Sequence, residues 1–335
     1  MATYCAYHLN FRSPLHLGRR GIELKKTEVS IPADTLFSAI CQTWRTFYGE
    51  ESLVQDFLEG YKNAEPFLLT SAFPFAGSLQ FFPKPLRQIE VSDDNRKGSK
   101  RVCFVSEKRF NQIVGGEQIK FNQEDLINNG KIWIHPDERS AINFLGDSEN
   151  SIVWQTDVKP RVTVDRRSSA SAIWHVGSVK FNPNCGLWFA AKYDEAKTQA
   201  RVETLLRVLG DTGIGGERNA GYGLFDLEVG CFAHTQDDMN SEGAQFVTLS
   251  PICPRDAEEL GALIQGDVSY TLSERSGWIS SPDASHLRRD RVWMFAEGSV
   301  LAGGGKQVGR LIDLGPNLCP HPVWRYGYAW PVKVR

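Results

Sequence analysis

The sequence predicts an α+β protein with two domains, and three observations lead to this fold class. The chain has 335 residues, about twice the length of an average domain of roughly 150 residues. Segments with the period of two that is typical of strands alternate with segments that have the 3.6-residue period of helices. In the first two thirds of the chain, the order is strand, helix, two strands, helix, strand. That order is the βαββαβ pattern of a ferredoxin-like domain with insertions.

The first half of this pattern consists of a strand and a helix. We expect the strand over Thr3–Phe11, because every second side chain in it is apolar. We expect Asp34 to cap the N-terminus of the following helix and Gly49 to end it. A second helix is predicted over residues 53–61. The apolar face of the first helix consists of Leu36, Phe37, Ile40, Trp44, Phe47 and Tyr48.

Between the two halves of the pattern, segment 67–86 is apolar but interrupted by prolines, so we expect it to be packed and non-helical, and segment 87–100 to be mobile. Strand character returns at residues 161–164, 173–181 and 186–193. A helix with apolar side chains at i, i+3, i+4 and i+7 follows and is expected to end at Gly210, before a strand over residues 225–229. Its apolar residues are Val202, Leu205, Leu206 and Leu209.

These elements predict an N-terminal domain over residues 1–232, with an insertion at about residues 65–155. A second, smaller α+β domain is predicted over residues 245–335. Its strand-like segments are residues 246–249, 269–272, 292–295 and 323–334.

Charge is distributed unevenly along the chain, although the formal net charge is only -2. Residues 84–120 carry nine basic and five acidic side chains, and residues 157–180 carry five basic and two acidic ones. Residues 226–259 form an acidic connector, with eight acidic side chains and Arg255 as the one basic residue. This pattern excludes a uniformly basic surface but leaves room for a local groove that binds a polyanion. An ordinary solvated surface is the alternative.

The seven cysteines are scattered and form no CxxC pair, which favours a reducing compartment over a disulfide framework. Neither paired Cys and His ligands nor an HExxH motif occurs, so we expect no metal and no cofactor. The N-terminus has no secretory signal, and no stretch is apolar enough for a membrane span. We therefore expect a cytoplasmic protein that does not contact a membrane.

The most informative local motif is the glycine-rich loop Gly210–Gly223. It is not a Walker A motif, because Tyr222 stands where a lysine is needed, and Arg218 replaces a glycine of the dinucleotide-binding motif. Its backbone could form an anion-binding nest, Arg218 could pair with a phosphate, and Tyr222 could stack on a base. A purely structural loop between helix and strand is the alternative.

Two further positions are candidates for a site. The free amides beside Asp34 and Thr35 could accept a phosphate oxygen, although an ordinary helix cap is the more frequent use of such residues. His16 is the one histidine that we consider for ribonuclease chemistry. Neither a GxSxG motif nor a Cys-His signature occurs in the chain.

Ordered sequence blocks that run from the first strand to the C-terminus suggest a family. They are His16-Leu-Gly18, Asp34-Thr-Leu-Phe-Ser-Ala39, Ser71-Ala-Phe-Pro-Phe75, Phe82-Pro-Lys-Pro-Leu86, Arg161-Val-Thr-Val-Asp-Arg166, Gly210–Gly223, Arg275-Ser-Gly-Trp-Ile279, Phe295-Ala-Glu-Gly-Ser299 and His321-Pro-Val-Trp-Arg-Tyr-Gly327. In these blocks the chain resembles the RAMP (repeat-associated mysterious protein) superfamily of CRISPR systems. Within it, the chain resembles the fourth subunits of type III-A Csm effector complexes.

The resemblance implies two ferredoxin-like domains and a non-catalytic subunit that binds the repeat-derived 5′ tag of the guide RNA (crRNA). It also implies contacts with the large polymerase-like subunit and with a backbone RAMP subunit. Two alternatives stay open: a RAMP endoribonuclease that processes precursor crRNA, and a scaffold subunit with little RNA contact. Together with Tyr222, the RNA-binding residues expected are His16, Asp34, Thr35, Ser38, Lys84, Arg161, Arg166, Arg167, Gly215, Gly216, Arg218 and Asn219.

Overall fold

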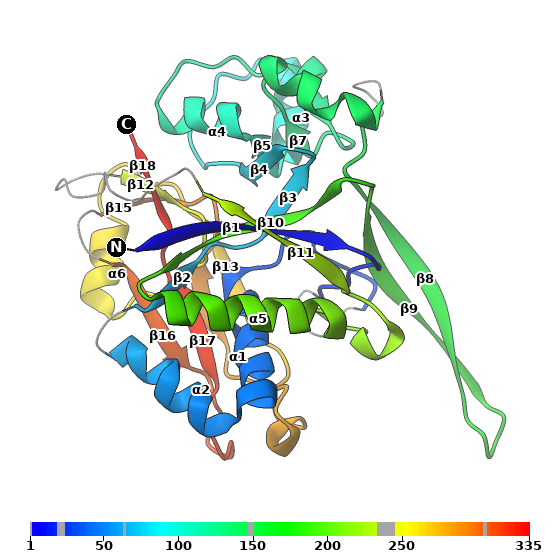
Figure 1. Ribbon diagram of the computed structural model, residues 1–335. Coiled ribbons are helices and arrows are strands. Elements are labelled where there is room, and N and C mark those ends of the chain that lie inside the picture. The colour runs from blue at the N-terminus through cyan, green and yellow to red at the C-terminus, as the bar shows by residue number, and fades with distance from the viewer. Residues whose placement is uncertain (1, 19–23, 63–64, 147–150, 233–244, 304–306) are drawn as a thin grey trace.

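The structure is a computed structural model that describes residues 2–18, 24–62, 65–146, 151–232, 245–303 and 307–335. Its centre is a nine-stranded mixed sheet, and the N-terminal helices pack on one side of it (Figure 1). The predicted α+β fold class is therefore confirmed. None of the helices within the described residues is long and apolar enough to cross a membrane.

The first two thirds of the chain contain the predicted βαββαβ core. Its elements are β1 (Thr3–Phe11), α1 (Ala33–Tyr48), β2 (Phe67–Leu69), β3 (Phe73–Ala76), β10 (Cys185–Tyr193), α5 (Ala196–Thr212) and β11 (Phe225–Cys231). The strands lie in the order β11-β1-β10-β3, and β2 also pairs with β10. Of the four core strands, the last (β11) thus lies beside the first (β1). The third (β10) lies between the first and the second (β3), which is the ferredoxin-like order.

The central strand β1 is antiparallel to both of its neighbours, so that Tyr7 pairs with Phe189 on β10 and with Val229 on β11. Cys5, Tyr7 and Leu9 are buried, as the alternation predicts. Ala6 on the opposite face is buried as well, because a central strand is covered on both faces.

Both core helices bury the faces that their sequences predict. α1 buries Leu36, Phe37, Ile40 and Trp44 and ends at Gly49 as expected, while Phe47 on its last turn is exposed. α5 continues past Gly210, where its end was predicted, and stops at Gly213. Gly210 is a close-approach position instead, because a Cβ there would collide with the carbonyl oxygen of Phe225 at the start of β11.

The predicted second helix is divided into α2 (Glu50–Asp56) and the 3₁₀ turn η1 (Leu58–Lys62). The insertion between β3 and β10 extends the sheet through β4, β5, β7 and β6. Segment 67–86 is packed and non-helical, as predicted, and it contains three strands: β2, β3 and all of the next one. The elements of the insertion are β4 (Leu79–Pro83), η2 (Asp93–Asn95), α3 (Arg96–Arg101), β5 (Phe104–Ser106), α4 (Glu107–Val114), η3 (Gln123–Asp125), β6 (Leu126–Ile127), β7 (Ile132–Trp133) and η4 (Pro136–Leu145).

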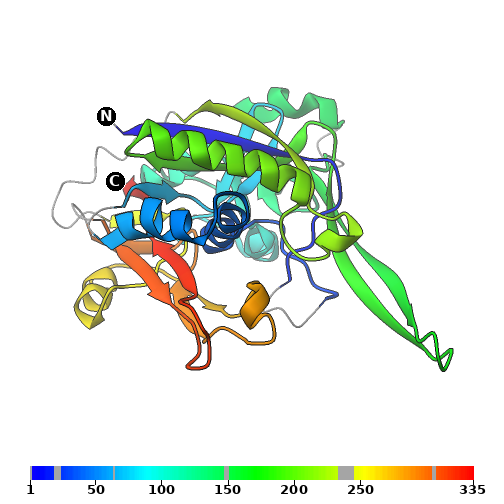
Figure 2. The same ribbon diagram turned by 60° about the horizontal axis from the view of Figure 1, so that its bottom comes forward.

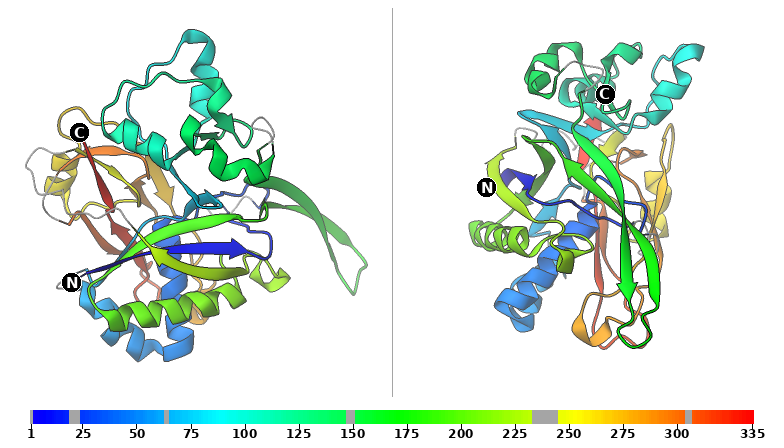
Figure 3. Two further views of the ribbon diagram at one scale, coloured as in Figure 1. Left: turned by 45° about the horizontal axis from the view of Figure 1, so that its top comes forward. Right: turned by 90° about the vertical axis from the view of Figure 1, so that its right-hand side faces the viewer.

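A long antiparallel hairpin leaves the body of the protein after the insertion. It consists of β8 (Trp154–Val164) and β9 (Ser171–Phe181), which pair along their whole length. The views of Figure 3 show that its outer half projects away from the sheet and the helices. Both strands are longer than the sequence predicted.

The C-terminal part forms three small sheets, β15-β12-β18, β13-β14 and β16-β17. Its elements are β12 (Gln245–Thr248), α6 (Ala257–Leu263), β13 (Leu272–Arg275), η7 (Pro282–Ala284), β14 (Val292–Phe295), β15 (Val300–Ala302), β16 (Gly309–Asp313), β17 (Trp324–Tyr328) and β18 (Pro331–Val334). The middle of the predicted acidic connector, residues 233–244, lies outside the described residues.

The C-terminal part shares the main hydrophobic core with the N-terminal part. Tyr326, Tyr328 and Trp330 belong to that core, and the ring of Tyr326 lies 5.4 Å from the ring of Phe37 on α1. Figure 2 shows α1 between α5 and the C-terminal strands. The first helix is therefore the element on which both parts of the chain pack.

Candidate nucleic-acid interface

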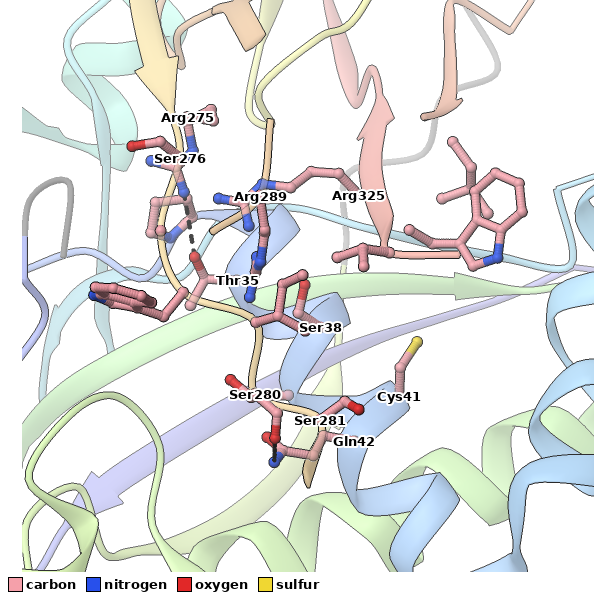
Figure 4. A pocket seen from close by; sticks show the side chains of 18 of the residues that line it. Thr35, Ser38, Cys41, Gln42, Arg275, Ser276, Ser280, Ser281, Arg289 and Arg325 are labelled. Atoms are coloured by element: carbon pink, nitrogen blue, oxygen red, sulfur yellow. Dashed lines mark hydrogen bonds between the residues drawn. The ribbon is translucent and has the colours of Figure 1, made fainter. Parts of the chain in front are cut away.

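A groove of about 1730 Å³ lies where the C-terminal part faces α1. One wall consists of α1 (Figure 4) and, beside it, the glycine loop after α5. The opposite wall consists of residues 271–282, Arg289, Trp293 and the facing ends of β16 and β17. We call this cavity the α1 groove.

Backbone contacts, rather than a side-chain cap, hold the start of α1 at this groove. Pro32 occupies the N-cap position, and its carbonyl oxygen accepts a hydrogen bond from the amide of Thr35 at 2.9 Å. The amide of Ala33 donates to Ser71 Oγ at 2.8 Å. The prediction that Asp34 caps the helix is wrong, because its carboxylate turns instead toward arginines of the C-terminal part.

Asp34 is fully buried and forms an ion cluster with Arg275 and Arg325. Arg275 donates from Nε to Oδ2 at 2.9 Å and from Nη2 to Oδ1 at 2.6 Å, and Arg325 Nε lies 2.6 Å from Oδ2. Arg275 also donates to Thr35 Oγ1 at 3.2 Å (Figure 4). Arg289 is close enough to interact electrostatically with Asp34. Three guanidinium groups around one carboxylate leave excess positive charge at the groove.

Burial and neighbouring charges shift the pKa values in this cluster in opposite directions. Burial alone would raise the pKa of Asp34, but the guanidinium groups outweigh it and lower that pKa, so Asp34 is ionised. Burial lowers the pKa of Arg325 to about 10, which still leaves this residue charged at neutral pH. Ser71 donates to the nearby Glu297, whose pKa is raised by burial. The cluster therefore carries net positive charge near neutral pH.

The glycine loop, residues 213–223, packs its backbone against the segment that follows β1. The amide of Gly216 donates to the carbonyl oxygen of His16 at 2.9 Å, and that of Gly223 donates to the carbonyl oxygen of Pro14 at 2.8 Å. Gly215 has a φ of +91°, and a Cβ there would collide with the carbonyl oxygen of His16. The loop thus presents mostly backbone to the groove, as its composition indicates.

Besides the fully buried Asp34, two further residues predicted to contact RNA are covered by other parts of the chain. His16 is buried, and its Nδ1 lies 2.7 Å from the carbonyl oxygen of Gly177 on β9. Tyr222 is only 6% exposed, and the guanidinium of Arg161 lies 5.5 Å from its ring centre. Arg161 also lies 3.9 Å from Glu217. These contacts join the hairpin to the glycine loop and leave little of the Tyr222 ring for a base.

The groove brings together only some of the residues predicted for RNA binding. Those that line it are Thr35, Ser38, Gly215, Gly216 and Arg218. Asn219 is exposed beside Arg218. Arg166 and Arg167 lie at the turn of the hairpin between β8 and β9, in the part that projects from the body.

Lys84 lies outside the groove. Its Nζ donates to the carbonyl oxygen of Ser99 at 2.8 Å, and burial lowers its pKa. Within the described part of the chain, no residue of either basic segment, 84–120 or 157–180, lines the groove. The positive charge at the groove comes from the arginines of the C-terminal part, from Arg218, and from Arg45 on α1, which pairs with Glu50 and Asp283.

The sequence reasoning missed the whole C-terminal wall. The blocks around Arg275 and Arg325 were visible in the sequence, but no local signal shows that they face α1. Arg275 and Asp34 are 241 positions apart in the chain, so only the folded structure brings them together. The wall residues without a predicted role are Arg275, Trp278, Arg289, Trp293, Arg310, Trp324 and Arg325.

A ferredoxin-like core with a glycine loop after its second helix is the architecture expected of a RAMP protein. The chain belongs to the RAMP superfamily, whose family model matches residues 8–226. The model of the CRISPR Csm4 C-terminal domain matches residues 241–334.

The chain is similar over nearly its whole length to proteins named CRISPR system Cms protein Csm4. The relative from Mycobacterium tuberculosis (strain CDC 1551 / Oshkosh) is 28% identical over 322 residues, which cover 95% of this chain and 93% of the relative. The relative from Thermococcus onnurineus (strain NA1) is 26% identical, and the match covers 90% of this chain and 91% of the relative.

Two solved structures have the same fold over the full length. A chain of the Csm3-Csm4 subcomplex from the type III-A CRISPR-Cas interference complex matches with a TM-score of 0.66 at 16% identity, covering 100% of this chain and 99% of its own. A chain of the Csm1-Csm4 cassette in complex with cA4 matches with a TM-score of 0.59 at 19% identity, covering 100% and 98%.

Proposed function

We propose that this chain is a non-catalytic subunit of a type III-A CRISPR effector complex and holds the 5′ tag of the crRNA in the α1 groove. In that complex it links the large polymerase-like subunit to a backbone RAMP subunit. The full-length similarity to Csm4 proteins supports this assignment, as does the fold shared with chains solved together with Csm3 or Csm1. A cytoplasmic location is part of the proposal, and free thiols such as Cys41 and Cys319 agree with a reducing compartment.

The observation that carries the RNA proposal is the combination of an arginine cluster and a glycine backbone in one groove. Single-stranded RNA follows an irregular path and needs charged groups for its phosphates and room for close backbone approach. Arg275, Arg289 and Arg218 supply the charge, and Gly215 and Gly216 supply a wall with few side chains. Both features face the same cavity.

We assign phosphate contacts to Arg218 and to the backbone of the glycine loop, with Asn219 beside them. The hydroxyl groups of Thr35 and Ser38 line the same cavity and can accept hydrogen bonds from the 2′-hydroxyl groups of RNA. Arg166 and Arg167 of the hairpin turn contact RNA that continues beyond the groove in this proposal.

A non-catalytic role is favoured by the state of His16, the residue considered for ribonuclease chemistry. A general base must reach the proton that it abstracts. His16 is buried, and its Nδ1 is held at the Gly177 carbonyl oxygen. Purified protein incubated with repeat RNA in the absence of divalent metal should therefore leave the RNA intact, and specific cleavage would establish the endoribonuclease alternative instead.

The RNA proposal is tested by reversing one charge in the groove. Arg218→Glu should weaken the binding of a fluorescent RNA that carries the tag, and should lower the slope of log K against log salt by about 0.7 for each lost phosphate contact. Arg207→Glu is the matched control, because Arg207 is exposed on α5 and does not line the groove. Equal affinities for wild type and Arg218→Glu would favour the scaffold alternative.

A further inference from the structure

All three exposed tryptophans of the described chain line the α1 groove. Trp278 is 50% exposed, Trp293 is 57% exposed and Trp324 is 39% exposed. Five of the other tryptophans are buried, and Trp174 on the hairpin is half-buried. Tryptophan has a large apolar ring system, and an exposed cluster of such rings is a frequent sign of a binding surface. Because all three line one cavity, we infer that the cavity binds a ligand with flat, apolar faces.

The three rings are carried by elements that hold them in place. Trp293 lies on β14, opposite Glu274 of β13, and Trp324 begins β17, opposite Asp313 of β16. Trp278 lies in the loop after β13, where it pairs with Arg288. All three therefore belong to the C-terminal wall, and α1 and the glycine loop form the opposite wall.

We propose that Trp278, Trp293 and Trp324 form a stacking wall that binds unpaired bases of single-stranded RNA. This inference rests on the proposed function and names the contacts that the same groove makes with bases. Base stacking on aromatic side chains is a general means of holding single strands and tolerates any base. The guanidinium of Arg288 lies 4.9 Å from the centre of the Trp278 ring, which holds that ring from one side. The side that faces the groove remains for a base.

The charge of the groove favours RNA over a protein as the occupant of this wall. Arg275 and Arg289 line the same cavity, beside Trp278 and Trp293. Five glutamates also line the cavity. Glu50 pairs with Arg45 and Glu274 with Arg291, and burial raises the pKa of Glu297, whereas Glu28 and Glu59 offset part of the positive charge. The centre of a protein interface is depleted of charged residues, whereas a strand of RNA needs cations beside its stacked bases.

The stacking wall has two consequences for the ligand. The bases must be unpaired, because a base within a duplex has no free face to offer. Stacking on the wall should also depend little on the base sequence of the RNA, because the rings contact the face of a base and not its hydrogen-bonding edge. We therefore expect the full chain to prefer single-stranded over double-stranded RNA of the same sequence.

The test uses the full chain and a synthetic single-stranded RNA with the tag sequence, beside the same RNA with abasic nucleotides in the tag. Each of Trp278→Ala, Trp293→Ala and Trp324→Ala should weaken binding of the intact RNA by about 5-fold to 100-fold. The corresponding phenylalanine variants should keep most of the affinity. On the abasic RNA the alanine variants should bind as wild type does. Binding of intact RNA should quench tryptophan fluorescence.

Tyr270→Ala is the matched control, because Tyr270 is an exposed aromatic residue of the same part of the chain that does not line the groove. If all three tryptophan variants bind RNA as wild type does while Arg218→Glu weakens binding, the stacking wall is refuted and the proposed function stands. If Arg218→Glu also has no effect, the proposed function fails. Loss of the large subunit on co-purification, with unchanged RNA affinity, would assign the wall to a protein and overturn the inference.

Discussion

Replacing Asp34 with asparagine tests the claim that a buried ion cluster joins α1 to the C-terminal part. The Asp34 side chain is 0% exposed, and those of its partners Arg275 and Arg325 are 17% and 5% exposed. Asparagine keeps the size of the side chain but removes its charge. Two buried guanidinium groups then remain without their counterion, next to Arg289.

The expected loss of stability is large. Removing one partner of a buried ion pair costs about 3–5 kcal/mol, because the remaining charge stays out of water without compensation. The unfolding entropy of a chain of this length is roughly 0.7 kcal/mol/K, from about 2.1 cal/mol/K for each residue. A loss of about 4 kcal/mol therefore lowers the melting temperature by about 6 °C.

Urea unfolding at pH 7 and thermal unfolding measure this loss directly. Asp283→Asn is the matched control, because the Asp283 side chain is 65% exposed and pairs with Arg45 on the surface. An exposed pair contributes at most about 1 kcal/mol, so the control should change the free energy of unfolding by no more than that. A loss below about 1 kcal/mol for Asp34→Asn would refute the account of the cluster.

Further measurements address the other carboxyl group of the cluster and the glycine loop. Because the pKa of Asp34 is lowered, its stabilising contribution is present above about pH 4 and is lost on acidification, and unfolding curves of Asp34→Asn should lack that loss. Because burial raises the pKa of Glu297, its contribution is complete at low pH and declines as pH rises above about 4.5. Glu297→Gln should abolish that decline, and an unchanged pH profile would contradict the assignment. Gly223→Ala should cost about 1–3 kcal/mol more than Gly221→Ala in urea unfolding, because both have positive φ but only Gly223 would collide with Ile214. Equal losses would contradict the close packing of the loop.

The periodic elements of the core could be predicted from the sequence because their burial follows their own residue order. The strand Thr3–Phe11 and the apolar face of α5 are examples. The prolines of segment 67–86 predict that it is not helical, which is confirmed, but they do not indicate its strands. Pro74 nevertheless lies within β3, paired with Leu187, and β3 is only four residues long. A short strand can thus hold a proline that a sequence pattern would take as a break.

The candidate site could be predicted only where one local segment defines it. Gly215 and Gly216 belong to a segment whose glycine-rich composition already indicates that other groups come close to its backbone. Asp34 resembles a helix cap in the sequence, and its pairing with Arg275 depends on a contact across 241 positions. Lys84 has no local signal that it would turn inward to Ser99.

The central claim is that the α1 groove holds the 5′ tag of a crRNA, and ultraviolet crosslinking of RNA that co-purifies with the assembled complex tests it most directly. The account predicts a short RNA with a uniform 5′ end, crosslinked through its tag to peptides that contain Gly215–Arg218 or Trp278. Tag crosslinks confined to other surfaces, such as the exposed side of α5 around Arg207, would contradict it.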